Sequence, residues 1–201
     1  MSAHSSYEEV IIAGFGGQGV ILAGKLLTQT AMKQGLEVTY MPSYGAEVRG
    51  GTANCMVVVA DVPIASPLVS NPTSLIAMNK ASLNKFAGRI KRGGLLIMNS
   101  SLIDEKPELD KTIDIIAVPA DDIAVKLSNK KAANMVMLGA YLQRKGVFGL
   151  DAAAVALPVV LAKRHHQTLP VNIEALHRGA EFAKEVKEGQ RDKGTKGQRE
   201  K

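Results

Sequence analysis

The segment between residues 14 and 19 has the residue types and spacing of an anion-binding turn. It reads Gly14-Phe15-Gly16-Gly17-Gln18-Gly19 and stands between an apolar run, 10–13, and a helix-like stretch, 20–34. Glycines at the first, third and sixth positions let the backbone turn tightly and approach a phosphate, pyrophosphate or carboxylate. Unpaired N–H groups and the positive end of the helix dipole favour negative charge there. The alternative is that these glycines only let the helix pack closely on the strand.

The next expected strand, 37–41, bears on which anion this turn would bind. Dinucleotide-binding folds place an acid at the end of the second strand, about 20 residues beyond the turn, where it binds ribose hydroxyls. Here the strand runs into Pro42 without a carboxylate at its end. Glu37 stands before the apolar part of the strand and Glu47 lies beyond it. NAD and FAD are therefore disfavoured as ligands.

The loop after Pro42 combines several groups that bind anions or partners. Its sequence from residue 43 to 52 contains the phenol of Tyr44, the carboxylate of Glu47, the guanidinium of Arg49 and the flexible pair Gly50-Gly51. In a parallel α/β sheet, loops at the carboxyl ends of strands face one crevice, so we expect this loop beside the glycine turn. The alternative is an exposed turn closed by a Glu47–Arg49 ion pair, which would contribute little energy.

Together the two segments carry a family resemblance. The order Gly-Phe-Gly-Gly-Gln-Gly-Val at residues 14–20, followed by Ser-Tyr-Gly-Ala-Glu-Val-Arg-Gly-Gly-Thr-Ala-Asn at 43–54, resembles the gamma subunit of 2-oxoacid:ferredoxin oxidoreductases. The same unit is a fused domain of pyruvate:ferredoxin oxidoreductase. The resemblance covers about residues 8–185 and includes the helix-like segment 134–140. Ala46 and Val48 depart from the Pro and Met that are common in the family.

The resemblance implies a subunit of a complex that converts a 2-oxoacid, coenzyme A and oxidised ferredoxin to acyl-CoA, carbon dioxide and reduced ferredoxin. Thiamine diphosphate, magnesium and iron–sulfur clusters are then expected on partner alpha, beta and ferredoxin-like delta subunits. This chain is expected to be inactive alone, to bind no metal, and to have no catalytic residue of its own. The oxoacid, whether pyruvate, 2-oxoglutarate or another, is not specified by the sequence.

Under this resemblance the chain closes the active site and helps hold coenzyme A. Anionic groups of coenzyme A would meet the turn and loop, at Gly14, Phe15, Gly16, Gly17, Gln18, Gly19, Tyr44, Glu47, Arg49, Gly50 and Gly51. A purely architectural subunit is one alternative, and a free-standing nucleotide-binding or phosphate-binding regulatory protein is another. The isolated chain could also self-associate.

Composition indicates one globular domain. The chain has 201 residues, 46% hydrophobic and 22% charged, with 4% aromatic residues and no Trp. Its single cysteine, Cys55, lies among apolar residues and is expected to be buried, since one thiol builds neither a disulfide framework nor an iron–sulfur site. The histidines are too scattered for a metal site. The absence of a secretory signal and of a long apolar stretch predicts a cytoplasmic protein without a membrane span.

The net charge of +6 raises the question of nucleic-acid binding. Residues 187–201 contain six basic and three acidic side chains, so half of the excess charge lies at this end. We expect a domain at 1–187 and a disordered basic tail at 188–201. No nucleic-acid motif is present in the body, so no nucleic-acid partner is expected.

Short apolar runs alternate with helix-like stretches along the first 120 residues. Strands are expected at 10–13, 37–41, 53–60, 75–78, 95–98 and 113–118, and helices at 19–34, 80–90, 131–145, 151–164 and 172–187. Asn79 suits the start of the second helix, and the turn near Pro63 suggests an antiparallel hairpin. This alternation predicts an α/β fold, a three-layer Rossmann-like α/β/α arrangement with a largely parallel, mixed sheet and a helical C-terminal half.

Overall fold

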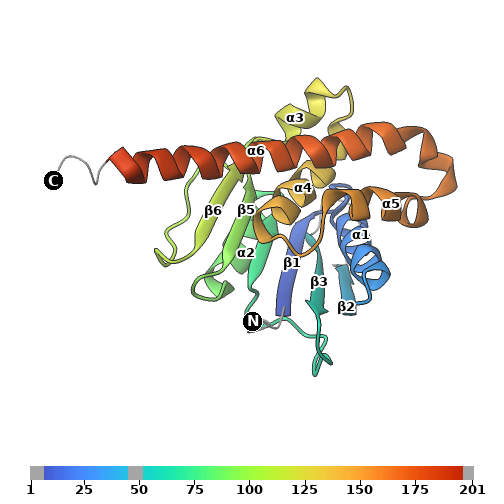
Figure 1. Ribbon diagram of the computed structural model, residues 1–201, viewed down its shortest axis with the longest axis horizontal. Coiled ribbons are helices and arrows are strands. Elements are labelled where there is room, and N and C mark those ends of the chain that lie inside the picture. The colour runs from blue at the N-terminus through green and yellow to red at the C-terminus, as the bar shows by residue number, and fades with distance from the viewer. Residues whose placement is uncertain (1–6, 45–51, 197–201) are drawn as a thin grey trace.

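The computed structural model describes residues 7–44 and 52–196. Within them, strands form a sheet in the order β2-β3-β1-β4-β5-β6 (Figure 1). Their bounds are β1 Tyr7–Phe15, β2 Glu37–Tyr44, β3 Thr52–Ala60, β4 Ser74–Ala77, β5 Leu95–Asn99 and β6 Asp114–Val118. β1, β4, β5 and β6 are parallel neighbours, whereas β3 runs antiparallel to both β1 and β2. The predicted largely parallel, mixed sheet is confirmed.

Helices cover both faces of this sheet. Their bounds are α1 Val20–Lys33, α2 Lys80–Phe86, α3 Ala120–Lys126, α4 Ala133–Lys145, α5 Leu150–Val160 and α6 Leu169–Lys196, with 3-10 helices η1 Ala87–Arg89, η2 Lys130–Ala132 and η3 Lys163–Thr168. Side chains of α1, α4, α5 and α6 form one apolar core with the sheet, and α2 forms a second core on the opposite face. The predicted three-layer α/β/α fold is confirmed.

The antiparallel pairing arises at a different place from the one predicted. β2 and β3 form a hairpin, since the connection 45–51 is too short for the crossover of a dozen or more residues that parallel strands need. The hairpin expected near Pro63 is wrong. β3 is followed by a proline-containing segment without strands, and β4 then pairs in parallel with β1.

β2 is longer than expected and includes Pro42. The expected end at Met41 is wrong, because the strand continues to Tyr44, with Pro42 opposite Cys55. Proline removes a backbone donor and is tolerated in an edge strand. β2 is such a strand in this sheet.

α6 is the element whose bounds differ most from the prediction. It begins at Leu169 rather than near residue 172, because Pro170 lies in the first helical turn, where its missing N–H costs no hydrogen bond. It continues to Lys196, so residues 188–196 are helical and the expected disorder from residue 188 is wrong for them. Figure 1 shows this helix lying across the molecule, with its C-terminal end extending past β6.

α4 is buried almost all round. Met135, Val136, Met137 and Leu138 are each 0% exposed. α6 crosses α4 with glycine on both sides of the contact. A Cβ added to Gly139 or to Gly179 would lie less than 3.0 Å from the facing backbone, at Leu176 and Val136 respectively. The two helix backbones therefore approach as closely as glycine permits.

Candidate functional site

The glycine turn joins the carboxyl end of β1 to the N-terminus of α1. Gly17 and Gly19 have φ of 94° and 74°, a left-handed conformation that L side chains rarely adopt. Gly14 has no room for a side chain, because an added Cβ would meet Gln18 at 2.8 Å and Val20 at 2.9 Å. The glycines at these positions are thus required by the turn itself, whatever it binds.

Gln18 holds the turn from within. Its Oε1 accepts hydrogen bonds from the backbone N–H of Phe15 at 2.7 Å and from Asn79 Nδ2 at 2.8 Å. Asn79 also caps α2 as predicted, accepting from the N–H of Ser82 at 2.9 Å. The side-chain oxygen of Gln18 is therefore engaged in positioning the turn against the end of β4.

Asn134 supports the turn from the other side. Its Nδ2 donates to the carbonyl oxygen of Gly19 at 2.9 Å, and its Oδ1 accepts from the N–H of Met135 at 3.0 Å. The side chain is buried, with 2% exposure. The buried amide of Asn134 therefore braces the glycine turn.

A hollow of about 440 Å³ opens beside the turn and the start of α1. Gly16, Gly17 and Gly19 line one side, and Ile21 and Lys25 of α1 line another. The first backbone N–H groups of a helix have no partner within it, and α1 carries no acidic residue in its first turn. Lys25, which sequence reasoning did not single out, adds an exposed ammonium one turn further along. This hollow has the chemistry of an anion site.

β2 ends and β3 begins beside this turn, on either side of the second predicted segment. Ala53 of β3 lies between Gly14 of β1 and Tyr44 of β2 in the sheet register, and Thr52 lies opposite Phe15. Neighbouring strands are about 4.8 Å apart, so the backbones of Gly14 and Tyr44 are about 10 Å apart. Tyr44 ends β2 at the expected edge of the sheet.

Glu47, Arg49, Gly50 and Gly51 lie outside the described residues, so their predicted contribution stays a prediction. Glu37 pairs with Ala60 at the edge of the sheet opposite the glycine turn. It is therefore not placed to bind a ribose at the turn.

A second set of polar residues lies at the carboxyl ends of β4 and β5. The sequence analysis did not identify this set. Asn99 is fully buried and donates from Nδ2 to Asp121 at 2.6 Å, while its Oδ1 accepts from the N–H of Ala120 at 3.2 Å. Lys130 Nζ lies 3.9 Å from the same aspartate. The available signal was a polar residue directly after each apolar strand, namely Asn79 after β4 and Asn99 at the end of β5.

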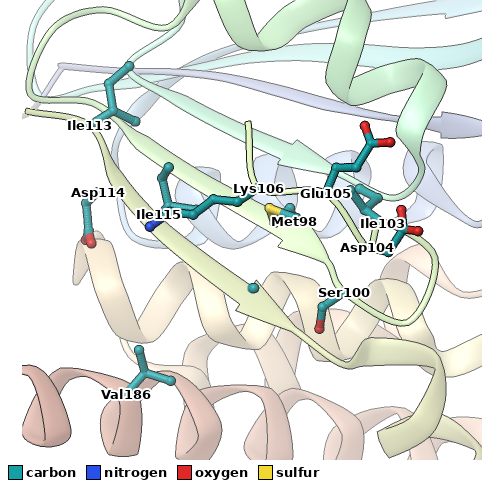
Figure 2. Close-up of a pocket in the computed structure, with 11 residues that line it drawn as sticks. Met98, Ser100, Ile103, Asp104, Glu105, Lys106, Ile113, Asp114, Ile115 and Val186 are labelled. Atoms are coloured by element: carbon teal, nitrogen blue, oxygen red, sulfur yellow. The ribbon is translucent and has the colours of Figure 1, made fainter. Parts of the chain in front are cut away.

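Another hollow, of about 580 Å³, lies along β5 and β6 and has different chemistry. Figure 2 shows Asp104 and Glu105 at one end of it, and Asp114 and Val186 of α6 toward the other. Glu105 pairs with Lys80 at 2.6 Å, and Asp114 pairs with Arg144. None of the predicted site residues lines this hollow.

Cys55 is buried, as predicted, against α1. Burial raises the pKa of its thiol from 9.0 to about 12. An added Cβ on Gly24 would lie less than 3.0 Å from its sulfur, so the thiol fills the space that this glycine leaves. Among residues 7–44 and 52–196 there is no cluster of three metal-ligating side chains, and no helix there has the length and apolar character to cross a bilayer.

Fold and turn together define a doubly wound α/β protein with a glycine turn at the carboxyl edge of its sheet. The family model for pyruvate ferredoxin/flavodoxin oxidoreductase matches residues 9–182, and the chain belongs to this family. The resemblance found in the two glycine-containing segments is confirmed.

Known relatives include both longer chains and chains of similar length. The ketoisovalerate oxidoreductase subunit VorA of Methanothermobacter marburgensis is 36% identical over 183 residues, which are 90% of this chain and 37% of VorA. The 2-oxoglutarate synthase subunit KorC of Methanocaldococcus jannaschii is 32% identical over 89% of this chain and 95% of KorC. The crystal structure of a keto/oxoacid ferredoxin oxidoreductase gamma subunit from Geobacter sulfurreducens superposes with a TM-score of 0.75 at 27% identity, covering 88% of this chain and 98% of that one. The chain thus spans just over a third of the VorA relatives and nearly all of KorC.

Proposed function

We propose that this chain is the gamma subunit of a 2-oxoacid:ferredoxin oxidoreductase and that its surface binds phosphate groups of coenzyme A. The observation that carries the proposal is the hollow at the glycine turn, in a chain of this family. The unpaired N–H groups at the start of α1 and the ammonium of Lys25 offer donors to a phosphate. The diphosphate of coenzyme A binds there in this proposal.

The chemistry itself belongs to the partner subunits. Oxidative decarboxylation uses thiamine diphosphate for the carbanion and iron–sulfur clusters for the electrons that pass to ferredoxin. The alpha, beta and ferredoxin-like delta subunits supply these groups, and the isolated gamma chain reduces no dye. VorA and KorC are named for different oxoacids, yet they are 36% and 32% identical to this chain. We therefore assign the choice of oxoacid to the other subunits.

Arg49, with Gly50 and Gly51 beside it in the sequence, completes the phosphate site in this proposal. The support is that β2 and β3, which lead into the loop, end beside the glycine turn. A guanidinium binds two phosphate oxygens at once, which an ammonium does not. Tyr44 and Glu47 then shape the loop or contact the catalytic subunits.

The test of this function compares two lysines of α1 in the assembled complex. Lys25→Gln removes the ammonium from the hollow and should raise the apparent KM for coenzyme A about tenfold, with the KM for the oxoacid unchanged. Lys33→Gln is the matched control, since Lys33 lies at the far end of α1, where its Nζ is 3.5 Å from the carbonyl oxygen of Val155. The chains that co-purify are identified in the same preparation. A Lys25 variant with poor assembly and an unchanged KM for coenzyme A would instead indicate a purely architectural subunit.

A further inference from the structure

α5 turns apolar side chains toward solvent, where a surface helix normally carries charged or polar residues. Val155 and Val159 lie one helical turn apart and have exposed fractions of 67% and 61%, the highest among the large apolar side chains of the described residues. Pro158 is exposed beside them, and the half-buried Ala152 lies on the same side of the helix. We call these four residues the α5 face. Asp151, in the first turn, is the only charged residue of this helix.

α6 shows the ordinary arrangement in the same chain. On its outer side Arg178 pairs with Glu174 at 2.7 Å and with Glu181 at 3.2 Å. The inward side chains of α5 are fully buried, namely Ala153, Ala156 and Leu157. α5 is thus apolar on both sides, although this chain covers only one of them. Contiguous exposed apolar side chains mark a surface that binds another protein or a ligand.

The α5 face adjoins the hollow beside α1. Val160, which follows Val159, lines that hollow together with Ile21 and Lys25 of α1. Figure 1 shows α5 lying beside α1, and Lys33 Nζ is 3.5 Å from the carbonyl oxygen of Val155. In the proposed function coenzyme A binds in this hollow, and its thiol must reach the thiamine diphosphate of a partner subunit. A surface of that partner therefore adjoins α5.

The 3-10 helix η3, which follows α5, gives the α5 face a basic end. Lys163 and Arg164 are exposed, and neither forms an ion pair within residues 7–44 and 52–196. Arg164 Nε donates to the neighbouring His165 at 3.2 Å, which leaves the charge of the guanidinium uncompensated. A complementary partner surface therefore has an apolar centre and carboxylates that face η3.

We propose that the α5 face docks the subunit that holds thiamine diphosphate, and that this subunit presents apolar side chains to Val155 and Val159 and carboxylates to Lys163 and Arg164. This inference rests on the proposed function, because the path of coenzyme A to thiamine diphosphate selects this subunit over the ferredoxin-like one and over a second copy of this chain. Removing the two valines from water stabilises the contact, and the charges at its edge orient the partner.

The first experiment dilutes the assembled complex and follows its dissociation by gel filtration. The double variant Val155→Lys/Val159→Lys should raise the dissociation constant of this chain about a hundredfold, because two apolar side chains lose their burial. Lysine is a better helix former than valine, so α5 should keep its structure, and thermal melts of the chain check this. Leu68→Lys is the control, since Leu68 is 60% exposed and lies outside α5.

The second experiment tests the charges at the end of the α5 face. Lys163→Glu/Arg164→Glu should raise the same dissociation constant about tenfold at low salt and much less at high salt, because exposed charges are screened. Lys106→Glu/Lys111→Glu makes an equal change of charge at two exposed lysines between β5 and β6, and should have no effect.

The third experiment identifies the partner by crosslinking in the assembled complex. Cys55 is the only cysteine of the chain and is buried, so Asp151→Cys creates a single accessible thiol at the edge of the α5 face. A photoactivatable crosslinker attached to this thiol should join the chain to the subunit that holds thiamine diphosphate. Mass spectrometry of the product identifies the crosslinked chain.

The outcomes separate this inference from the proposed function. An unchanged dissociation constant in the valine variant, an equal loss in Leu68→Lys, or a crosslink to the ferredoxin-like subunit, to a second copy or to no chain would overturn the docking at α5. In each of these cases an increased KM for coenzyme A in Lys25→Gln would still support the site beside α1. If Lys25→Gln has no effect while the crosslink and the valine variant behave as expected, the docking stands and the coenzyme A site is wrong.

Discussion

Asn134 Nδ2 donates to the carbonyl oxygen of Gly19 at 2.9 Å and so ties α4 to a turn that lies 115 residues earlier in the chain. Gly19 itself is in the left-handed conformation, and an added Cβ would lie less than 3.0 Å from the amide nitrogen of Asn134. The start of α1 and the buried helix α4 are thus fitted to each other at one backbone position. We infer that the shape of the candidate anion site depends on this contact.

Replacing Asn134 should weaken both the fold and the site. Asn134→Leu removes two hydrogen bonds in a buried position and should lower the free energy of unfolding by about 1–3 kcal/mol. Urea denaturation of the isolated chain measures this loss. Asn129→Leu is the control, because that side chain makes no hydrogen bond within the described residues. Equal stability of the two variants would show that the Asn134 contact contributes nothing.

The loss of stability caused by substituting each turn glycine should depend on the space around that glycine. Gly19→Ala combines a left-handed backbone with the clash against Asn134, and should cost more than Gly17→Ala, where nothing lies within 4 Å. We expect about 1–2 kcal/mol for the backbone conformation alone, and a larger loss at Gly19. Gly88→Ala, with open space and no positive φ, is the control. If Gly17→Ala destabilises as much as Gly19→Ala in urea titrations, the tight fit at Asn134 is wrong.

The crossing of α4 and α6 should tolerate no side chain at its two glycines. Gly139→Ala and Gly179→Ala each place a methyl group against facing backbone, which cannot rotate away, so we expect about 3 kcal/mol of destabilisation in each. Gly149→Ala is the control, since no atom lies within 4 Å of a Cβ added to Gly149. Thermal melts of the three variants measure how much each substitution lowers the melting temperature. A normal melting temperature for Gly139→Ala would mean that the backbones of α4 and α6 are not in close contact at Gly139.

Cys55 should be chemically inert in the folded chain. Because burial raises its pKa to about 12, the thiol stays protonated at pH 8 and should react with a disulfide reagent only after denaturation. Rapid reaction of the native protein would contradict this burial.

The same shift makes stability depend on pH. Between pH 9 and 12 the unfolded thiol loses its proton and the folded one keeps it, so the unfolded state binds fewer protons and the free energy of unfolding falls as pH rises. Tyr141 acts in the same direction at higher pH, because burial raises the pKa of its phenol well above 10.0. Cys55→Ala should show a shallower decline between pH 9 and 11 than the unsubstituted chain.

The sequence predicted local features of the site better than the directions of strands. The strand, glycine turn and helix follow from residue types within one short segment, and so does the cap at Asn79. The burial of Met135 to Leu138 follows from apolar residues on all sides of a helix. These features depend on local chemistry, which a sequence displays directly.

Features that depend on distant pairing were harder to predict. β3 is apolar on both faces, and that pattern holds equally for parallel and antiparallel neighbours. The shortness of the connection 45–51 was the signal for a hairpin. The hydrogen bond between Asn99 and Asp121 depends on strands β5 and β6 lying side by side, which only the structure shows. The length of α6 differed because charged and polar residues that suggest disorder are also good helix formers.

The kinetics of an Arg49→Ala complex measure directly whether this chain binds coenzyme A. If this chain holds phosphate groups of coenzyme A, the variant complex should assemble with normal stoichiometry and have an apparent KM for coenzyme A about tenfold to a hundredfold higher, since a charge-assisted contact of about 1.5–3 kcal/mol is lost. The KM for the oxoacid should not change. Gel filtration gives the stoichiometry, and steady-state rates give both constants. A complex that assembles normally with an unaltered KM for coenzyme A would show that Arg49 does not bind its phosphate groups.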